Sequence, residues 1–186
     1  MVVDIFNTDK KYNIIYADPP WEFKTYSAKG KEKKSAECHY PCMKKEDIQK
    51  LPIADLCKEN CVLFLWVTFP KLQEGLELIK AWGFEYKTCG FTWAKQNKKS
   101  DTFFMGCGYW TRANAELCLL ATKGKPKRIS ASVRQLCTAR IMEHSKKPPE
   151  IRDRIVNLCG DLPRIELFAR QYADGWDCWG NEVQRS

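Results

Sequence analysis

The sequence has no hydrophobic run long enough to cross a membrane. Its longest clear apolar run, residues 61–67, has the length of a strand, whereas a membrane helix needs about 20 apolar residues. The first residues, MVVDIFNTDKK, also lack a basic leader followed by an apolar stretch, so we expect no secretory signal. We therefore expect a soluble protein of the cytoplasm with no membrane partner.

Histidine is scarce as well: there are 2 in 186 residues, and neither lies in a spacing typical of a metal site or a catalytic triad. Cysteine is not scarce, with 10, but without a signal peptide we expect these thiols to be reduced. Two C-x3-C pairs, Cys38 with Cys42 and Cys57 with Cys61, leave a zinc site as a minor alternative. Structural zinc usually takes C-x2-C, and Cys61 begins what reads as a buried strand, so we expect no metal.

The composition excludes a disordered tail, because 44% of the residues are hydrophobic and 12% are aromatic. A length of 186 residues without a visible repeat or linker indicates one domain, residues 1–186. Lys and Arg exceed Asp and Glu by 31 to 23, and the excess is concentrated in loops at 29–34, 95–99 and 123–128. One such run is often only a solvated loop, but three together favour a shared surface for a polyanion. Its phosphate contacts would include Lys33, Lys34, Lys125 and Lys127.

Strand and helix patterns alternate along the chain. Strands are predicted at 12–17, 61–67, 84–94, 115–121 and 164–169, and helices at 44–51, from Pro70 to Gly83 and from Pro148 onward. The buried faces of the last two helices should carry Leu72, Leu76 and Ile79, and then Ile151, Ile155 and Leu158. The alternation predicts an α/β domain with a largely parallel sheet. Such sheets bind ligands at the carboxyl ends of their strands, where Asp18 and Arg170 fall.

The tetrapeptide Asp18-Pro19-Pro20-Trp21 directly follows the first predicted strand. The amine on a planar base is a poor nucleophile, because its lone pair is delocalised into the ring. Acceptors for both of its N–H groups return electron density to the nitrogen, and Asp18 and the Pro19 carbonyl can supply them. The two prolines preorganise these acceptors, and Trp21 offers the base a face for stacking. The alternative is a tight turn that an aromatic side chain covers.

With these residues the sequence resembles the MT-A family of adenine N6-methyltransferases, which includes the messenger-RNA N6-adenosine methyltransferase catalytic subunit and bacterial and phage relatives. IIYADPPW matches the family's catalytic motif, and GYWTRANAELCLLATKGKP, KKPPEIRDRI, RIELFAR and WGNE are similar to its later motifs. The resemblance covers nearly the whole chain. It implies a Rossmann-like sheet that binds S-adenosylmethionine (SAM), in the circularly permuted order with the catalytic motif before the cofactor strand.

The resemblance also implies roles for single residues. Lys147 would pair with the carboxylate of SAM, and Asp18 would lie near its amino group. Further cofactor positions are Asp4, Ile5, Glu166, Arg170, Asn181 and Glu182. The positions on the substrate side are Tyr40, Trp110 and Glu116. One departure is Gln171-Tyr172-Ala173, where many relatives carry Pro-His-Asn, so two polar contacts to SAM that the resemblance implies are replaced or lost.

We therefore expect transfer of the SAM methyl group to the 6-amino nitrogen of adenine in nucleic acid, with the base extruded or single-stranded. The chain lacks the N-terminal extension and zinc-finger region of the eukaryotic catalytic subunit, which favours a minimal bacterial or phage-type enzyme acting on DNA rather than RNA. It could work as a homodimer or with a related subunit. The alternatives are a non-catalytic nucleic-acid-binding partner subunit and a SAM enzyme that acts on a protein amide or a free nucleotide.

Overall fold

A seven-stranded sheet, in the order β5-β3-β4-β2-β1-β6-β7, runs through the molecule. The computed structural model describes residues 1–21, 43–108, 110–143 and 146–183. The strands are β1 (Tyr12–Ala17), β2 (Cys57–Val67), β3 (Glu85–Gln96), β4 (Ala115–Lys123), β5 (Leu136–Arg140), β6 (Arg164–Leu167) and β7 (Asp177–Trp179). β4 is antiparallel to both of its neighbours, whereas all other pairs are parallel. The predicted α/β class and largely parallel sheet are thus confirmed.

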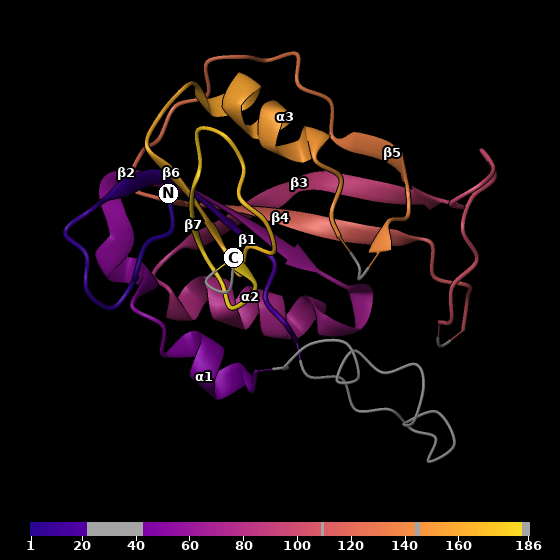
Figure 1. Cartoon of the computed structure of the whole chain (residues 1–186), viewed down its shortest axis with the longest axis horizontal. Helices are drawn as coiled ribbons and strands as arrows, with labels where there is room; N and C mark the ends of the chain where they lie inside the picture. The colour runs from indigo at the N-terminus through magenta and orange to yellow at the C-terminus, as the bar shows by residue number, and fades with distance from the viewer. Residues whose placement is uncertain (22–42, 109, 144–145, 184–186) are drawn as a thin grey trace.

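Helices cover both faces of the sheet (Figure 1). The helices are α1 (Lys45–Gln49), α2 (Leu72–Ala81) and α3 (Glu150–Cys159), with short 3-10 turns at Ile53–Leu56 and Phe69–Lys71. Side chains alternate along β1, so that Ile15 packs in the core under α1 and α2 while Ile14 and Tyr16 pack in the core under α3. None of the described helices is both long and apolar enough to cross a membrane.

The buried face of α2 differs from the one predicted. Leu78 is buried with Ile79, whereas Leu76 is 37% exposed. The cause is Gly75, which packs so closely on β2 that an added Cβ would clash with Val67 Cγ1. The helix turns this small residue toward the sheet, and the leucine spacing alone does not reveal such a close approach. In α3 the predicted Ile151 and Ile155 are buried.

The carboxyl ends of three neighbouring strands meet at one edge of the sheet. Ala17 of β1 pairs with Leu167 of β6, which pairs in turn with Trp179 of β7. The N-terminal segment extends this row, because Val2 bridges Cys178 in parallel and the Val3 N–H donates to the Cys178 carbonyl at 2.9 Å. Residues that follow each of these strands therefore gather at the same edge, which we call the carboxyl edge.

Candidate active site

The carboxyl edge brings together most of the residues predicted for the cofactor. Asp18 follows β1, Arg170 lies just after β6, and Asn181 and Glu182 follow β7. Asp4 is exposed, and its Oδ1 accepts a hydrogen bond from the Phe6 N–H at 3.0 Å. These residues come from sequence positions far apart, and the strand register alone makes them neighbours.

Two other cofactor candidates are placed differently. Ile5 is buried in the core, with 3% of its surface exposed. Lys147 lies between β5 and α3. β5 is parallel to β3, which ends at the carboxyl edge, so the segment that follows β5 also starts at this edge. Its side chain is 10% exposed, and Pro148 after it is buried. Lys147 is therefore not simply a solvated lysine at the start of a helix.

Four side chains of alternating charge lie in a row that ends at Asp18. Lys147 Nζ is 2.9 Å from Asp18 Oδ2 and 3.2 Å from Glu116 Oε2. The other carboxylate oxygen of Glu116, Oε1, accepts a hydrogen bond from Lys95 Nζ. Lys147 Nζ also lies 5.6 Å from the centre of the Trp66 ring, a favourable position for a cation. We call Lys95, Glu116, Lys147 and Asp18 the charge row.

The charge row keeps its buried members ionised. Burial disfavours the charged carboxylate of Glu116, but Lys147 and Lys95 outweigh burial and hold its pKa below the usual value. Burial likewise opposes the charged form of Lys147, but Asp18 and Glu116 raise its pKa well above that of a free lysine. Buried charges are tolerated only when paired in this way. The row therefore presents a fixed carboxylate and a fixed ammonium group at the carboxyl edge.

The turn after β1 is held rigidly against the neighbouring strand. Trp21 is 5% exposed, and its Nε1–H donates to the Trp66 carbonyl of β2 at 3.4 Å. The Trp21 backbone N–H donates to the Pro19 carbonyl at 2.9 Å, and the Pro20 carbonyl accepts from the Met43 N–H at 3.0 Å. A carbonyl has two lone pairs, so Pro19 keeps one for a ligand. Trp21 has little exposed ring surface here, and its stacking on a base stays a prediction.

Glu166 is the second buried carboxylate of this region, with 8% of its surface exposed. Arg152 of α3 binds both of its oxygens, through Nε to Oε2 at 2.6 Å and through Nη2 to Oε1 at 2.7 Å. Burial raises the pKa of Glu166, and Arg152 opposes that rise. Each carboxylate oxygen accepts one bond from Arg152, so a ribose hydroxyl would have to share Glu166 with it.

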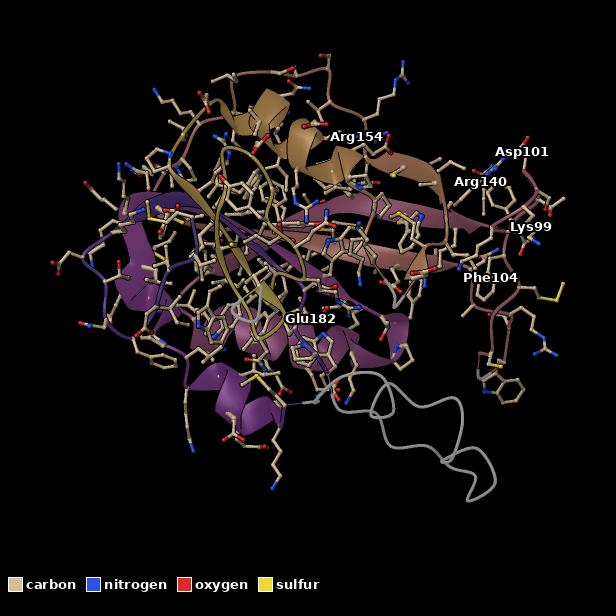
Figure 2. The ribbon with its side chains drawn as sticks, in the orientation of Figure 1. Lys99, Asp101, Phe104, Arg140, Arg154 and Glu182 are labelled. Atoms are coloured by element: carbon tan, nitrogen blue, oxygen red, sulfur yellow. The ribbon has the colours of Figure 1, made fainter. Side chains whose placement is uncertain are left out.

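The segment between β6 and β7 has a constrained backbone. Phe168 has a φ of 60°, which is unusual for a residue other than glycine. Its ring packs edge-on against Trp179, with ring centres 5.3 Å apart, and Arg170 Nε lies 3.9 Å from Glu182 Oε1. Figure 2 shows Glu182 near the middle of the molecule. The predicted cofactor residues Arg170 and Glu182 thus contact each other.

The substrate-side predictions have different outcomes. Glu116 lies in the charge row, whereas Trp110 is fully exposed on the connection between β3 and β4. We call this connection, residues 97–114, the β3–β4 arm. It contains Lys99, Asp101 and Phe104, which Figure 2 shows beside Arg140 at one end of the molecule. Three other predicted residues lie outside the described part of the chain, namely Lys33, Lys34 and Tyr40.

The basic loop at 123–128 lies far from Asp18 and from the basic run at 95–99, which corrects the expectation of one shared basic surface. Lys123 pairs with Cys61 at the start of the apolar part of β2, whereas Leu117 pairs with Val67 near the carboxyl edge. Six residues of strand separate these positions, about 20 Å. The backbone N–H of Lys125 donates to Asn60 Oδ1 at this far edge. Lys125 and Lys127 thus lie at the opposite edge of the sheet from Asp18, because β4 runs antiparallel.

Sequence reasoning missed two partners of the buried carboxylates. It did not single out Arg152, and it placed Lys95 only in the basic loop at 95–99. A signal existed for both, since Glu116 and Glu166 lie in apolar strands and a buried carboxylate needs a cation. Trp93 pairs with Glu116 across β3 and β4, which places Lys95, two residues on, diagonally beside it on the same face.

The cysteine pairs were the alternative metal site. Cys57 is partly exposed and Cys61 is buried, and the Cys57 thiol contacts the Ile53 carbonyl at 3.2 Å. Cys38 and Cys42 lie outside the described residues. In the part of the chain that the structure describes, no three His, Cys, Asp or Glu side chains are grouped as ligands of one metal ion.

Comparison with known proteins agrees with this arrangement. The family model MT-A70 matches residues 12–182. The Type II methyltransferase M.MunI of Mycoplasma sp is 35% identical over 190 residues, which cover 94% of this chain and 78% of that protein. The N(6)-adenosine-methyltransferase catalytic subunit METTL3 of Homo sapiens is 28% identical over 93% of this chain, and the N(6)-adenosine-methyltransferase MT-A70-like protein of Arabidopsis thaliana is 27% identical over 97%.

The lengths of these relatives differ. The chain spans 78% of the Mycoplasma protein but only 28% of the human one and 24% of the Arabidopsis one. The family match covers the motif after β1, the charge row and the residues that follow β7. It confirms the resemblance inferred from the motifs. The chain belongs to the MT-A70 family of adenine N6-methyltransferases.

Proposed function

We propose that this chain transfers the methyl group of SAM to the N6 amine of adenine in nucleic acid, with DNA preferred over RNA. The observation that carries this proposal is the position of Asp18. Asp18 directly follows a buried parallel strand and precedes two prolines that make the turn rigid. Its Oδ2 lies 2.9 Å from Lys147 Nζ. A fixed acceptor at the carboxyl edge is what an amine of low nucleophilicity requires.

The residues of the turn act on the amine. The Asp18 carboxylate accepts one N–H of the adenine amine, and the free lone pair of the Pro19 carbonyl accepts the other. Both bonds push electron density toward N6. Trp21, anchored through its indole to the Trp66 carbonyl, holds these acceptors in place. Preorganised acceptors of this kind contribute about 10²–10³ in rate.

The polar side chains at the carboxyl edge match the polar groups of SAM. The cofactor carries a carboxylate, an ammonium group, a ribose diol and an adenine, and when bound it supplies an electrophilic methyl group on its sulfonium. Lys147 offers a cation for the carboxylate, and the exposed carboxylates of Asp4 and Glu182 can accept from hydroxyl or amino groups. Arg170 and Asn181 complete the set. Carboxylates beside parallel strand ends are typical of ribose sites.

The substrate must present its amine outside a duplex. Inside a base pair the N6 amine faces its pairing partner, so the base has to be flipped out or single-stranded. We prefer DNA because the Type II methyltransferase, which acts on DNA, is 35% identical to this chain. The relatives named for N(6)-adenosine, which is a ribonucleoside, are 27–28% identical.

Mass spectrometry of nucleosides tests the proposal. The enzyme is incubated with SAM and either DNA or RNA, and both polymers are digested and assayed for N6-methylated adenine. We expect the product in DNA, and more of it than in RNA. Product in RNA alone would overturn the preference for DNA. SAM binding by calorimetry without methylation of either polymer would overturn the catalytic assignment and favour a non-catalytic partner subunit.

A further inference from the structure

Lys95 ends the charge row on the side away from Asp18. It lies near the end of β3, and its side chain is 18% exposed. Its Nζ donates to Glu116 Oε1 and lies 5.1 Å from the centre of the Trp93 ring. The side chain of Glu116 is 6% exposed. Lys95 is therefore partly buried and paired, unlike Lys98 and Lys99, which follow it and are exposed.

The geometry makes Glu116 a bridge between two lysines. One of its oxygens contacts Lys95, and the other contacts Lys147 at 3.2 Å. Lys147 in turn divides its charge between Glu116 and Asp18, at 3.2 and 2.9 Å. Without Lys95, the full negative charge of Glu116 would act on Lys147. Coulomb attraction at these distances is strong away from bulk water, so Lys147 would move toward Glu116 and away from Asp18.

We propose that Lys95 is a positioning residue for the methyl-transfer reaction: by pairing with one oxygen of Glu116, it keeps Lys147 shared between Glu116 and Asp18. This inference rests on the proposed function. Lys95 itself touches neither reactant. It acts through Glu116 on the orientation of Lys147 and, through Lys147, on the Asp18 carboxylate that accepts the amine.

A double-mutant cycle tests whether Lys95 acts through Glu116. Lys95→Met keeps the length of the side chain and removes its charge, and Lys95→Arg restores a cation. We expect Lys95→Met to lower kcat about 10- to 100-fold, as misplaced catalytic groups do, with a smaller change in KM for DNA. Lys95→Arg should recover most of the loss. In an enzyme that already carries Glu116→Gln, adding Lys95→Met should change kcat by less than about twofold, the scatter between independent sites.

Lys87 provides a matched control. It lies on the same strand and pairs with Glu85 at 2.6 Å, but its side chain is 42% exposed and lies outside the charge row. Lys87→Met should leave kcat unchanged. If Lys95→Met lowers kcat by the same factor in the wild-type and the Glu116→Gln backgrounds, Lys95 acts independently of Glu116, for example on a phosphate. That result, or full activity of Lys95→Met, would overturn the proposal.

A second cycle on urea unfolding separates this proposal from the proposed function, because it needs neither SAM nor DNA. The urea concentration at the midpoint of unfolding should fall when Lys95→Met is introduced into the wild-type protein. It should change little when the same substitution is introduced into the Glu116→Gln protein. Coupling in unfolding without coupling in kcat would make Lys95 only structural and overturn the positioning role. If the wild type methylates nothing, the proposed function fails, and the unfolding cycle still decides whether Lys95 is linked to Glu116.

Discussion

Asp18 is the residue on which the proposed chemistry depends. Its carboxylate lies 2.9 Å from Lys147 Nζ, and the two prolines after it restrict the backbone, so its position is set before a substrate arrives. Asp18→Asn keeps the shape of the side chain but replaces an acceptor with a group that can also donate. We expect kcat to fall about 10²–10³-fold, the loss typical of one preorganised electrostatic contact. Single-turnover rates with saturating DNA measure this directly.

The control for this change is binding. Asp18→Asn should still bind DNA with nearly wild-type affinity, because the lysines that we expect to contact phosphates lie elsewhere. Circular dichroism should show an intact fold. A folded Asp18→Asn enzyme with wild-type single-turnover rate would contradict the role assigned to the carboxylate.

Glu116 makes stability depend on pH. Its pKa is held below the ordinary value of 4.5 in the folded protein by Lys147 and Lys95, which outweigh burial. A lowered folded pKa contributes stability above the unfolded pKa, and this contribution is lost as pH falls through the folded value. Glu116→Gln should therefore destabilise the protein at pH 7 by roughly 3 kcal/mol, the low end for a broken buried ion pair. The difference from wild type should shrink below about pH 4.5.

Urea unfolding between about pH 3 and pH 8, a range that spans the titration of a carboxyl group, measures this difference. Glu85→Gln serves as the comparison, because Glu85 pairs with Lys87 on the same sheet but is 77% exposed. The unfolding free energy of Glu85→Gln should differ from that of wild type by the same amount at every pH. A difference in unfolding free energy between wild type and Glu116→Gln that stays constant across the whole pH range would contradict the predicted pH dependence. It would mean that the carboxylate does not titrate as the charge row requires.

The residues of the site were only partly predictable from the sequence. The rigid D-P-P-W motif after a strand points to Asp18, and the resemblance points to Lys147 and Glu116. Their mutual contacts were not predictable, since those depend on β5 ending and β4 beginning at the same edge. Lys95 looks like one more lysine in a basic run. The run Lys95-Gln96-Asn97-Lys98-Lys99 begins inside a strand and continues into a loop, and composition does not mark that boundary.

At the scale of the elements, the apolar strands and the helices were predictable, whereas β5 and β7 were not. β5 is exposed along much of its length and carries a polar sequence, LCTAR, and β7 has only three residues, DCW. Neither has an apolar run, and both form because a neighbour supplies the hydrogen-bonding edge. The direction of β4 is equally invisible in its own sequence, AELCLLATK.

The link between β6 and β7 depends on a close backbone contact at Gly180. A Cβ added there would clash with the Ala169 carbonyl oxygen and lie 2.6 Å from the Ala169 nitrogen. These are backbone atoms and cannot rotate away. Gly180→Ala should therefore separate the ends of β6 and β7, which carry Arg170 and Asn181. We expect a loss of about 1–3 kcal/mol in unfolding free energy, as for other overpacked sites, and weaker SAM binding by calorimetry.

Gly83 offers a contrasting variant. It has a φ of 80° but nothing within 4 Å of an added Cβ, and it lies just before β3 begins, at the edge away from Asp18. Gly83→Ala should cost about 1–2 kcal/mol through backbone strain alone and leave SAM affinity unchanged. Equal SAM affinity for the Gly180→Ala protein and wild type would exclude this link from the cofactor site.

At the scale of the whole molecule, the net charge is +8, and the basic runs at 95–99 and 123–128 lie at opposite edges of the sheet. Lys125 and Lys127 lie at the far edge, where the Lys125 N–H binds Asn60. The β3–β4 arm leaves the sheet at the edge that holds Glu116, because β3 ends and β4 begins there. The arm carries exposed apolar side chains, namely Phe103 at 58%, Met105 at 74% and Trp110 at 101%.

This combination favours the arm over the far edge as a nucleic-acid contact. Exposed aromatic rings stack on unpaired bases, and lysines beside them neutralise phosphates. The arm includes the exposed Lys98 and Lys99, and Arg140 is tied to it through Asp101 at 2.9 Å. A base held at Asp18 would leave its flanking strand close to this edge, whereas Lys125 and Lys127 lie about 20 Å of strand away.

Salt dependence distinguishes the two edges. Each phosphate contact adds a log–log slope of about −0.9 on duplex DNA or −0.7 on a single strand. The double variant Lys98→Ala, Lys99→Ala should reduce the steepness of the slope by the amount that one or two phosphate contacts contribute. It should also raise the apparent KM for DNA and leave SAM affinity unchanged. Lys125→Ala with Lys127→Ala removes the same charge from the far edge and should leave slope and KM near wild type. Fluorescence anisotropy over a salt series measures all three proteins. A flatter slope for the far-edge pair alone would mean that DNA crosses the opposite end of the sheet, and the arm would then lose its assignment as the polymer contact.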